Sequence, residues 1–385
     1  MKITPRLFAV LGASVALFTL ATFARKSSSS TRFLAFVGTY TRKTESKGIY
    51  AFEFDARSGK LTPKGIAAET LDPSWIVIHP SGKFAYAANE AGKQSSITAF
   101  AIDPQSAKLT QLNQLPALGE DPCHLSIDKT GKFLFVANYS SGTVAVFPIF
   151  ADGRLGEHTS VLKDTGTPGP NKGRQEAPHA HWIAVSPDNR FVLVSDLGLD
   201  DLLIFRFDSA KGTLVPNDPP SAKLAAGAGP RHAAFSADGR FVYVVSELNS
   251  TVTVFNFEAS KGVLYDPQVV RTLPKDFEGR NDTAEVVLHP NGKWLFASNR
   301  GHDTIAVFSV DPVEGKLQPA GEFPTGGKEP RHFAIDPTGQ FLLAENQNSN
   351  TIVVFRIDRD KGTLTQVSKV DGIPSPVSLA FLPMS

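Results

Sequence analysis

One phrase returns along the chain at a nearly constant interval, and it constrains the fold more than any other feature. Each copy has a Pro- or Asp-containing turn, a Gly or Asn followed by a basic or amide residue, an aromatic residue, a short apolar run and a small polar cluster. The turn positions 82, 131, 189, 239, 292 and 339 lie about 50 residues apart, which is the spacing of propeller blades. The copies read HPSGKFAYAANE, DKTGKFLFVANY, SPDNRFVLVSDL, SADGRFVYVVSEL, HPNGKWLFASNR and DPTGQFLLAENQ.

A second phrase, an apolar strand with Phe, follows each copy after a short gap. Its seven examples are IYAFEFD, ITAFAID, VAVFPIF, LLIFRFD, VTVFNFE, IAVFSVD and IVVFRID. These runs alternate or are apolar throughout over five to eight residues, and Gly, Pro, Asp and Asn bound them, which favours strands. No stretch after residue 31 has a sustained helical period, so the sequence predicts an all-β domain.

The two ends of this domain are expected to complete one blade together. The copy FLAFVGTY, from Phe33, has no inner strand before it, and the last segment, PSPVSLAFL, resembles an inner strand with nothing after it. Pairing the two would close the ring without a long free edge. The prediction is one seven-bladed β-propeller of four-stranded antiparallel blades over residues 31–385.

The first thirty residues differ from the rest. Lys2 and Arg6 precede an apolar run over residues 7–24, and Arg25 and Lys26 follow it. This layout is typical of a secretory signal, so residues 1–30 are interpreted as a signal peptide or an uncleaved N-terminal anchor. The protein is therefore expected to be exported, periplasmic or extracellular.

The composition argues against several classes of partner. The 39 Lys+Arg balance 38 Asp+Glu, which gives no reason to expect nucleic acid, or a membrane beyond the possible anchor. Cys123 is the only cysteine, so an intrachain disulfide and a thiolate metal cluster are excluded. A monomer that binds a small molecule is the expected state.

Histidine, arginine and acidic residues gather at the segments that enter the innermost strands. These segments read DPSW, DPCH, APHAHW, GPRH, DTAEV, EPRH and PSPV, and they contain five of the nine histidines. Antiparallel order places them on the same face as the turns that follow the second strands. Such convergence at one channel mouth is typical of a ligand site. The residues on this face include His124, His179, His181, Arg231, His232, Glu285, Arg331 and His332 from the entries, and Asn89, Glu90, Asn138, Asp196, Glu247, Asn299, Arg300 and Asn346 from the turns.

Simpler interpretations of this pattern than a ligand site remain open. An arginine in a Pro-Arg-His turn can cap the start of a strand by bonding carbonyl groups of the next blade. Because residues i and i+2 of a strand point the same way, His179 and His181 are expected to face the channel together. A metal site of two histidines and one carboxylate is conceivable. However, no acidic residue lies at a spacing from these histidines that is typical of a metal ligand, so no metal is predicted.

A Gly/Pro-rich segment, Gly166–Gln175, leads directly into the entry that carries His179. Its place at the channel mouth suggests either a mobile lid that brings Lys172 and Arg174 over a ligand or a slack surface loop.

A larger set of motifs resembles the propeller-type 6-phosphogluconolactonases, a family that is itself similar to fungal enzymes interconverting a muconate and its lactone. The motifs are VGTYT, PCHLSID, FVANY, RQEAPHAH, VSDLGLD, AGPRHAAF, SELNSTVTVF, NDTAEV, SNRGHDTIAVF and GGKEPRHFAIDPTGQFLL, and they span the chain from about residue 33 to its end. The resemblance implies hydrolysis of a sugar δ-lactone with no cofactor and no metal. It assigns to the site His124, Arg174, His179, His181, Asp196, Arg231, Glu247, Glu285, Arg300 and Arg331.

Within that set, His179 or His181 is expected to be the base that activates water, oriented by Asp196 or Glu285, because an imidazole titrates near neutral pH. The six remaining residues are expected to bind substrate, with Arg231 and Arg331 as an anion clamp or oxyanion donors. The expected substrate is 6-phosphogluconolactone or a related lactone of the exported compartment, since the export signal departs from a cytoplasmic pentose-phosphate enzyme. The alternatives are a muconate-lactonizing type of enzyme and a non-catalytic exported propeller that binds a ligand.

Overall fold

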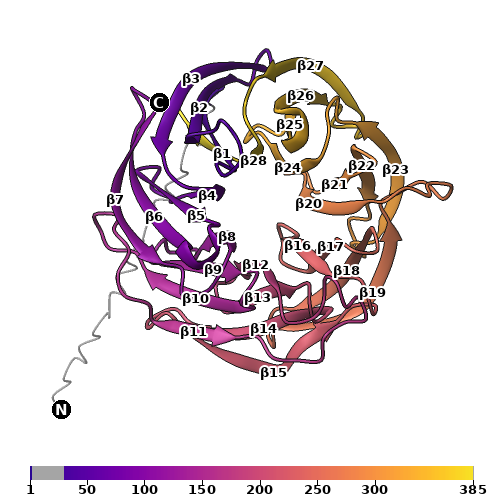
Figure 1. Ribbon diagram of the computed structural model, residues 1–385. Coiled ribbons are helices and arrows are strands. Elements are labelled where there is room, and N and C mark those ends of the chain that lie inside the picture. The colour runs from indigo at the N-terminus through magenta and orange to yellow at the C-terminus, as the bar shows by residue number, and fades with distance from the viewer. Residues whose placement is uncertain (2–29, 385) are drawn as a thin grey trace.

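The computed structural model describes Met1 and residues 30–384, and these form seven four-stranded antiparallel sheets around a central axis (Figure 1). The seven-bladed propeller predicted from the repeats is confirmed. The innermost strands are β28 (Pro376–Pro383), β4 (Pro73–Ile78), β8 (Pro122–Ile127), β12 (Ala180–Val185), β16 (Pro230–Phe235), β20 (Asp282–Leu288) and β24 (Pro330–Ile335).

The other strands follow outward from the axis in chain order, so that each blade is a meander. The second strands are β1 (Arg32–Thr39), β5 (Phe84–Asn89), β9 (Phe133–Asn138), β13 (Phe191–Asp196), β17 (Phe241–Ser246), β21 (Trp294–Arg300) and β25 (Phe341–Asn346). The third strands are β2 (Gly48–Asp55), β6 (Ser96–Asp103), β10 (Thr143–Pro148), β14 (Asp201–Asp208), β18 (Thr251–Glu258), β22 (Thr304–Val310) and β26 (Thr351–Ile357). The outer strands are β3 (Lys60–Glu69), β7 (Lys108–Pro116), β11 (Ser160–Lys163), β15 (Thr213–Lys223), β19 (Val263–Arg271), β23 (Leu317–Pro324) and β27 (Leu364–Asp371). Two 3-10 turns, Gly92–Gln94 and Gln347–Ser349, follow β5 and β25.

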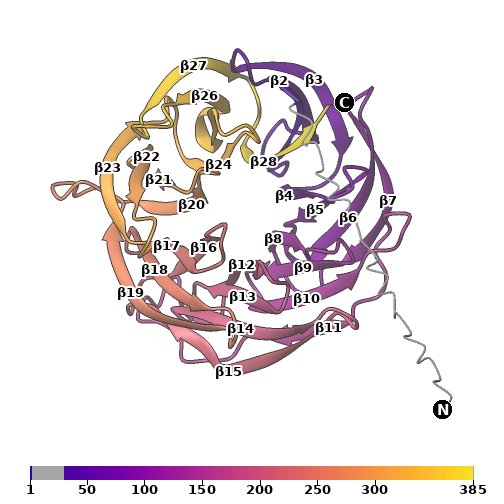
Figure 2. The same cartoon turned by 180° about the vertical axis from the view of Figure 1, so that it is seen from behind.

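The first and last strands close the ring. β28 pairs antiparallel with β1 from Phe33 opposite Pro383 to Thr39 opposite Pro376. The order β28-β1-β2-β3 therefore completes one blade from both ends of the domain, as the sequence predicts. Figure 2 shows the same closed ring from behind.

The hydrophobic core is divided into seven clusters, one at each interface between neighbouring blades. The cluster between the blades of β9 and β13, for example, joins Phe135 and Val146 to Val192 and Val194. Burying one such side chain stabilises the fold by about 1.5–3 kcal/mol, so each interface holds the two sheets in a fixed relation. This rigidity fixes the positions of the strand ends at the channel mouth.

The face opposite the mouth carries repeated turns that connect neighbouring blades. His79 Nε2 donates a hydrogen bond to the carbonyl oxygen of Gly131 at 2.8 Å, and His289 makes the same bond to Gly339. Gly131 has a φ of 75°, and a Cβ there would lie 2.7 Å from His79 Nε2. His79 and His289 therefore have a structural explanation.

The expected export segment lies, from residue 2 to residue 29, outside the described residues. Within the part of the chain that the structure describes, no helix is long and apolar enough to cross a membrane.

Candidate active site

A β-bulge near the start of the inner strand is repeated in most blades, and it determines which side chains reach the channel mouth. Pro122 of β8 pairs with Asn138, whereas His124 pairs with Ala137, so Cys123 has no residue opposite it. A bulge of this kind turns consecutive side chains toward the same side of the sheet. The bulged residues are Ser74, Cys123, His181, Arg231 and Arg331.

Three of the bulged residues, Cys123, His181 and Arg331, line a polar cavity of about 340 Å³ at the channel mouth, which we call the mouth pocket. This volume is within the range of sites for small metabolites. Its walls come from inner-strand entries, from the turns after the second strands and from the Gly166–Gln175 loop. The lining residues are Glu90, Cys123, Tyr139, Arg174, His181, Glu247, Arg280, Asp282, Arg300, Glu329 and Arg331.

Glu247 is the centre of a buried ionic network beside this pocket. Its carboxylate accepts a hydrogen bond from Arg174 and lies 3.0 Å from Arg231 Nε and 2.7 Å from Arg300 Nη2. Burial opposes ionisation of Glu247, but Arg300, Arg231 and Arg174 outweigh it and lower its pKa to about 2. The carboxylate therefore remains charged and fixes the three guanidinium groups in place.

Positive charge exceeds negative charge in this network. Arg231 also donates through Nη1 to the carbonyl oxygen of Ala284 at 2.6 Å, and only 3% of its side chain is exposed. Burial, together with Arg300 and Arg331, lowers the pKa of Arg231 to about 10. Three guanidinium groups share the Glu247 carboxylate, so the positive charge of this network favours a developing negative charge beside it.

A second set of polar contacts, separate from the Glu247 network, holds Arg331. Arg331 Nη2 donates to Tyr40 Oη at 2.9 Å, and Tyr40 in turn donates to Glu90 Oε2 at 2.8 Å. The guanidinium lies over the Tyr40 ring at 5.4 Å. Burial raises the pKa of Glu90, the only acidic residue in this chain of contacts. Tyr40 thus holds Arg331 against the pocket wall.

His181 is the imidazole that reaches the mouth pocket. Its ring contacts Tyr139 edge-on at 5.4 Å, and Nδ1 lies 3.7 Å from Cys123 Sγ. Burial, Arg231 and His232 lower the pKa of His181 well below its usual 6.5, so the ring is neutral at pH 7. A neutral imidazole can accept a proton from water.

His179 lies outside the pocket lining. Its ring stacks on Tyr139 at 4.5 Å, Nδ1 donates to the Tyr139 carbonyl oxygen at 3.0 Å, and Nε2 lies 3.1 Å from Glu176 Oε1. Both histidines thus contact the same tyrosine, but only His181 faces the cavity.

The channel beneath the mouth pocket is filled by a second layer, which we call the channel cluster. Ring centroids of His124, His232 and His332 lie 4.4, 5.1 and 5.2 Å from that of Trp75. His232 and His332 each contact a buried carboxyl group through Nδ1, at 2.9 Å to Glu285 and 2.5 Å to Glu345. Burial lowers the pKa of all three imidazoles, that of His332 to about 4. The cluster consists of Trp75, His124, His232, Glu285, His332 and Glu345.

Asp196 and Glu285, the two carboxylates expected to orient the base, bond to other groups. This corrects that part of the sequence prediction. Asp196 Oδ1 accepts hydrogen bonds from the backbone N–H groups of His179 and Leu199, at 2.9 and 3.0 Å, and so fixes the loop rather than an imidazole. Glu285 pairs with His232, not with His179 or His181. Strand alternation could not show this, because the bulges change which residues face each other.

The asparagines expected on the rim are buried and hold the turns together. Asn138 Nδ2 donates to the Ala117 carbonyl oxygen at 3.1 Å, and Asn299 Nδ2 to that of Thr272 at 2.9 Å. Asn89 and Asn346 make equivalent bonds, to Leu71 and Thr325. They support the site without facing it.

Of the ten predicted residues, Arg174, His181, Glu247, Arg300 and Arg331 line the mouth pocket, and Arg231 joins them through Glu247. His124 and Glu285 lie one layer below, and His179 and Asp196 lie behind the wall. Sequence reasoning missed Tyr40, Tyr139, Arg280, Asp282 and Glu329. A signal for Glu329 existed, because it precedes the proline of an inner-strand entry, as Asp72 and Asp121 do, and all three have positive φ.

Metal ligation finds no support in the geometry. Across Met1 and residues 30–384, no group of three or more His, Cys, Asp or Glu side chains is arranged to hold a metal ion.

The fold and the site define a seven-bladed propeller with an arginine-rich small-molecule pocket at one end of its channel. The family model for the seven-bladed β-propeller lactonases matches residues 34–381, and the chain belongs to this family. It is thus a carboxylic-ester hydrolase that opens lactones.

Individual relatives cover nearly the whole domain. A Bacillus subtilis (strain 168) protein named 6-phosphogluconolactonase is 36% identical over 352 residues, which are 91% of this chain and 99% of that protein. A Formosa agariphila protein of the same name is 33% identical over 306 residues, 78% of this chain and 85% of that protein. The structure of the Pseudomonas aeruginosa periplasmic gluconolactonase superposes with a TM-score of 0.86 at 34% identity, covering 91% of this chain and 99% of that one.

Proposed function

We propose that the protein hydrolyses a sugar δ-lactone to the aldonic acid in an exported compartment, with His181 as general base. The observation that carries this proposal is the position of one neutral imidazole in a pocket lined mainly by guanidinium and carboxylate groups. A lactone is neutral in the ground state and becomes negatively charged at its carbonyl oxygen during attack. The pocket matches this change in charge.

In the proposed reaction, His181 takes a proton from a water molecule as the water oxygen bonds to the lactone carbonyl carbon. The carbonyl oxygen becomes an oxyanion, which then expels the ring oxygen as the carbon–oxygen bond of the ring breaks. The proton on His181 passes to that ring oxygen, giving a hydroxyl group and a carboxylic acid that ionises. The base is thereby restored, and no co-reactant besides water is consumed.

Arg331 is the proposed oxyanion donor. It is half-buried and lies close enough to His181 for its charge to lower the pKa of that imidazole. The Tyr40 hydroxyl fixes its orientation, so little reorganisation is needed when the oxyanion forms. Arg174 and Arg280 lie on the outer side of the pocket, beside Asp282, and are placed to contact a substituent of the sugar.

The compartment is proposed from the N-terminal segment and from one relative. Residues 1–30 have the layout of a secretory signal, and the similar Pseudomonas aeruginosa protein is called periplasmic. Phosphorylated sugar lactones are not expected outside the membrane, so glucono-δ-lactone, rather than its 6-phosphate, is the simpler substrate of this site.

The test is hydrolysis of freshly prepared glucono-δ-lactone and 6-phosphoglucono-δ-lactone, with spontaneous opening subtracted. We expect turnover of at least one lactone, and a loss of about 100-fold or more in kcat for His181→Asn. His158→Asn, at an exposed histidine remote from the mouth, is the matched control and should keep full activity. Absence of enzymatic turnover for both lactones, or unchanged kcat in His181→Asn, would overturn the proposal.

A further inference from the structure

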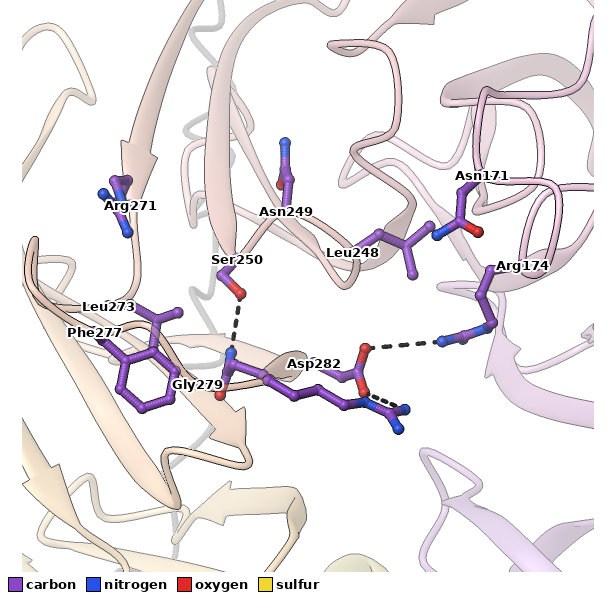
Figure 3. Close-up of a pocket in the computed structure, with 12 residues that line it drawn as sticks. Asn171, Arg174, Leu248, Asn249, Ser250, Arg271, Leu273, Phe277, Gly279 and Asp282 are labelled. Carbon is purple, nitrogen blue, oxygen red and sulfur yellow. Dashed lines mark hydrogen bonds and ion pairs between the residues drawn. The ribbon is translucent and has the colours of Figure 1, made fainter.

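A second cavity, of about 520 Å³, opens beside the mouth pocket, and we call it the outer pocket. Three loops of the channel-mouth face form it: residues 171–174 before β12, residues 248–250 between β17 and β18, and residues 271–282 between β19 and β20. Figure 3 shows Arg174 and Asn171 on one side of this space and Phe277 and Leu273 on the other, with Asp282 between them.

The two cavities are adjacent. Arg174, Arg280 and Asp282 line both of them. Asp282 lies 3.8 Å from Arg174 Nη1 and 3.1 Å from Arg280 Nη2, so these ion pairs mark the boundary (Figure 3). Glu247 holds Arg174 in place, whereas the Arg280 side chain is 87% exposed, and an ion pair with such access to water is weak and rearranges easily. One ligand can therefore extend from the mouth pocket into the outer pocket.

The lining of the outer pocket has an apolar part and a polar part. Leu273 and Phe277 give it an apolar wall, and the half-buried Phe277 ring is held edge-on by His302 at 4.7 Å between centroids. Leu248 and the amide and guanidinium groups of Asn171, Asn249 and Arg271 line the rest of the pocket (Figure 3). A pyranose ring has the matching surface, because its C–H bonds pack on an aromatic ring while its hydroxyl groups bond to amides and guanidinium.

We propose that the outer pocket binds a second sugar ring, so that the substrate is an aldobionolactone, a δ-lactone whose 4- or 6-hydroxyl carries a glycosidically linked sugar. This inference rests on the proposed lactone hydrolysis and names its substrate class. The lactone ring occupies the mouth pocket with its carbonyl group at His181 and Arg331, and the linkage passes between Arg174 and Arg280. A phosphate group at the same position leaves the apolar wall uncovered.

The experiment compares kcat/KM of the full-length protein for three lactones: glucono-δ-lactone, cellobiono-δ-lactone with a 4-linked sugar, and gentiobiono-δ-lactone with a 6-linked sugar. We expect at least one disaccharide lactone to exceed glucono-δ-lactone about 10-fold, because the second ring adds contacts with Phe277 and the polar rim. Phe277→Ala should remove this advantage and leave glucono-δ-lactone unchanged, since Phe277 does not line the mouth pocket.

Two further variants separate binding from folding. Phe277→Tyr keeps the aromatic ring and should retain the preference for the disaccharide lactone. Phe150→Ala removes an exposed phenylalanine from a turn between β10 and β11, away from both cavities, and should behave as the unaltered protein.

The outcomes distinguish this inference from the proposed function. 6-Phosphoglucono-δ-lactone is measured beside the three lactones, and hydrolysis of none of the four contradicts the proposed function itself. Hydrolysis of glucono-δ-lactone with no gain for either disaccharide lactone, or an equal loss for all lactones in Phe277→Ala, overturns the outer-pocket inference alone. A preference for 6-phosphoglucono-δ-lactone over all three would assign the boundary arginines to a phosphate and would also overturn it.

Discussion

Replacing Glu247 by Gln tests whether one buried carboxylate holds the arginines of the mouth pocket together. The substitution keeps the shape of the side chain and removes the negative charge that Arg174, Arg231 and Arg300 share. Three guanidinium groups are then left near one another without their common counter-ion, and two of them, Arg231 and Arg300, are almost fully buried. Removing one partner of a buried ionic group is strongly destabilising.

The magnitude follows from the pKa of Glu247. Its neighbours lower that pKa from an ordinary 4.5 to about 2. At about 1.4 kcal/mol for each pKa unit, the charged form contributes roughly 3 kcal/mol to the free energy of unfolding at pH 7. Because the folded-state pKa is depressed, this contribution is complete above pH 4.5 and is lost as the pH falls toward 2.

The assay is urea unfolding of the unaltered protein and Glu247→Gln at several pH values, followed by tryptophan fluorescence. We expect a difference of roughly 3 kcal/mol at pH 7 that begins to shrink below pH 4.5. Glu314→Gln, in an exposed pair with Lys316, is the control and should leave the urea midpoint unchanged. A difference below about 1 kcal/mol at pH 7, or one that does not depend on pH, would refute the electrostatic reasoning.

The remaining predictions concern the reaction. Because burial and neighbouring charges hold the pKa of His181 well below 6.5, kcat/KM should be independent of pH between 6 and 8 and should fall only in more acidic solution; a midpoint at or above 6.5 would exclude this imidazole as the base. Arg331→Met should lower kcat about 100-fold or more with a smaller change in KM, measured by initial rates, since it removes a donor to the oxyanion. A chelator should leave the rate unchanged, and loss of activity on dialysis against it would contradict the metal-free mechanism.

The fold was predictable because its information is repeated in the sequence. Each blade carries a turn, an aromatic residue and two apolar strands at matching positions, and the unpaired runs at Phe33 and Pro376 identify the shared blade. The same repetition places the inner-strand entries on one face. These predictions depend only on strand order and on the two-residue alternation of side chains.

The details of the site were not predictable because they depend on register. The bulge at His181 is visible only once β12 is paired with β13, and it separates the roles of His179 and His181 that alternation makes equal. Tyr40 was missed for a similar reason. It lies far from Arg331 in sequence and meets it only because the first and seventh blades are neighbours in the closed ring.

The two layers of the channel limit how a substrate can bind. The bulges at Cys123 and Arg331 place these two side chains at the mouth pocket and the next residues, His124 and His332, in the channel cluster, where Trp75 and three imidazoles pack together. The cluster closes the channel below His181, so substrate must enter and product must leave through the mouth. A group attached to the lactone therefore has to extend outward, and the ion pairs of Asp282 with Arg174 and Arg280 stand at the opening toward the outer pocket. Because the mouth pocket opens only outward, contacts in the outer pocket are the ones that distinguish a larger substrate from a smaller one.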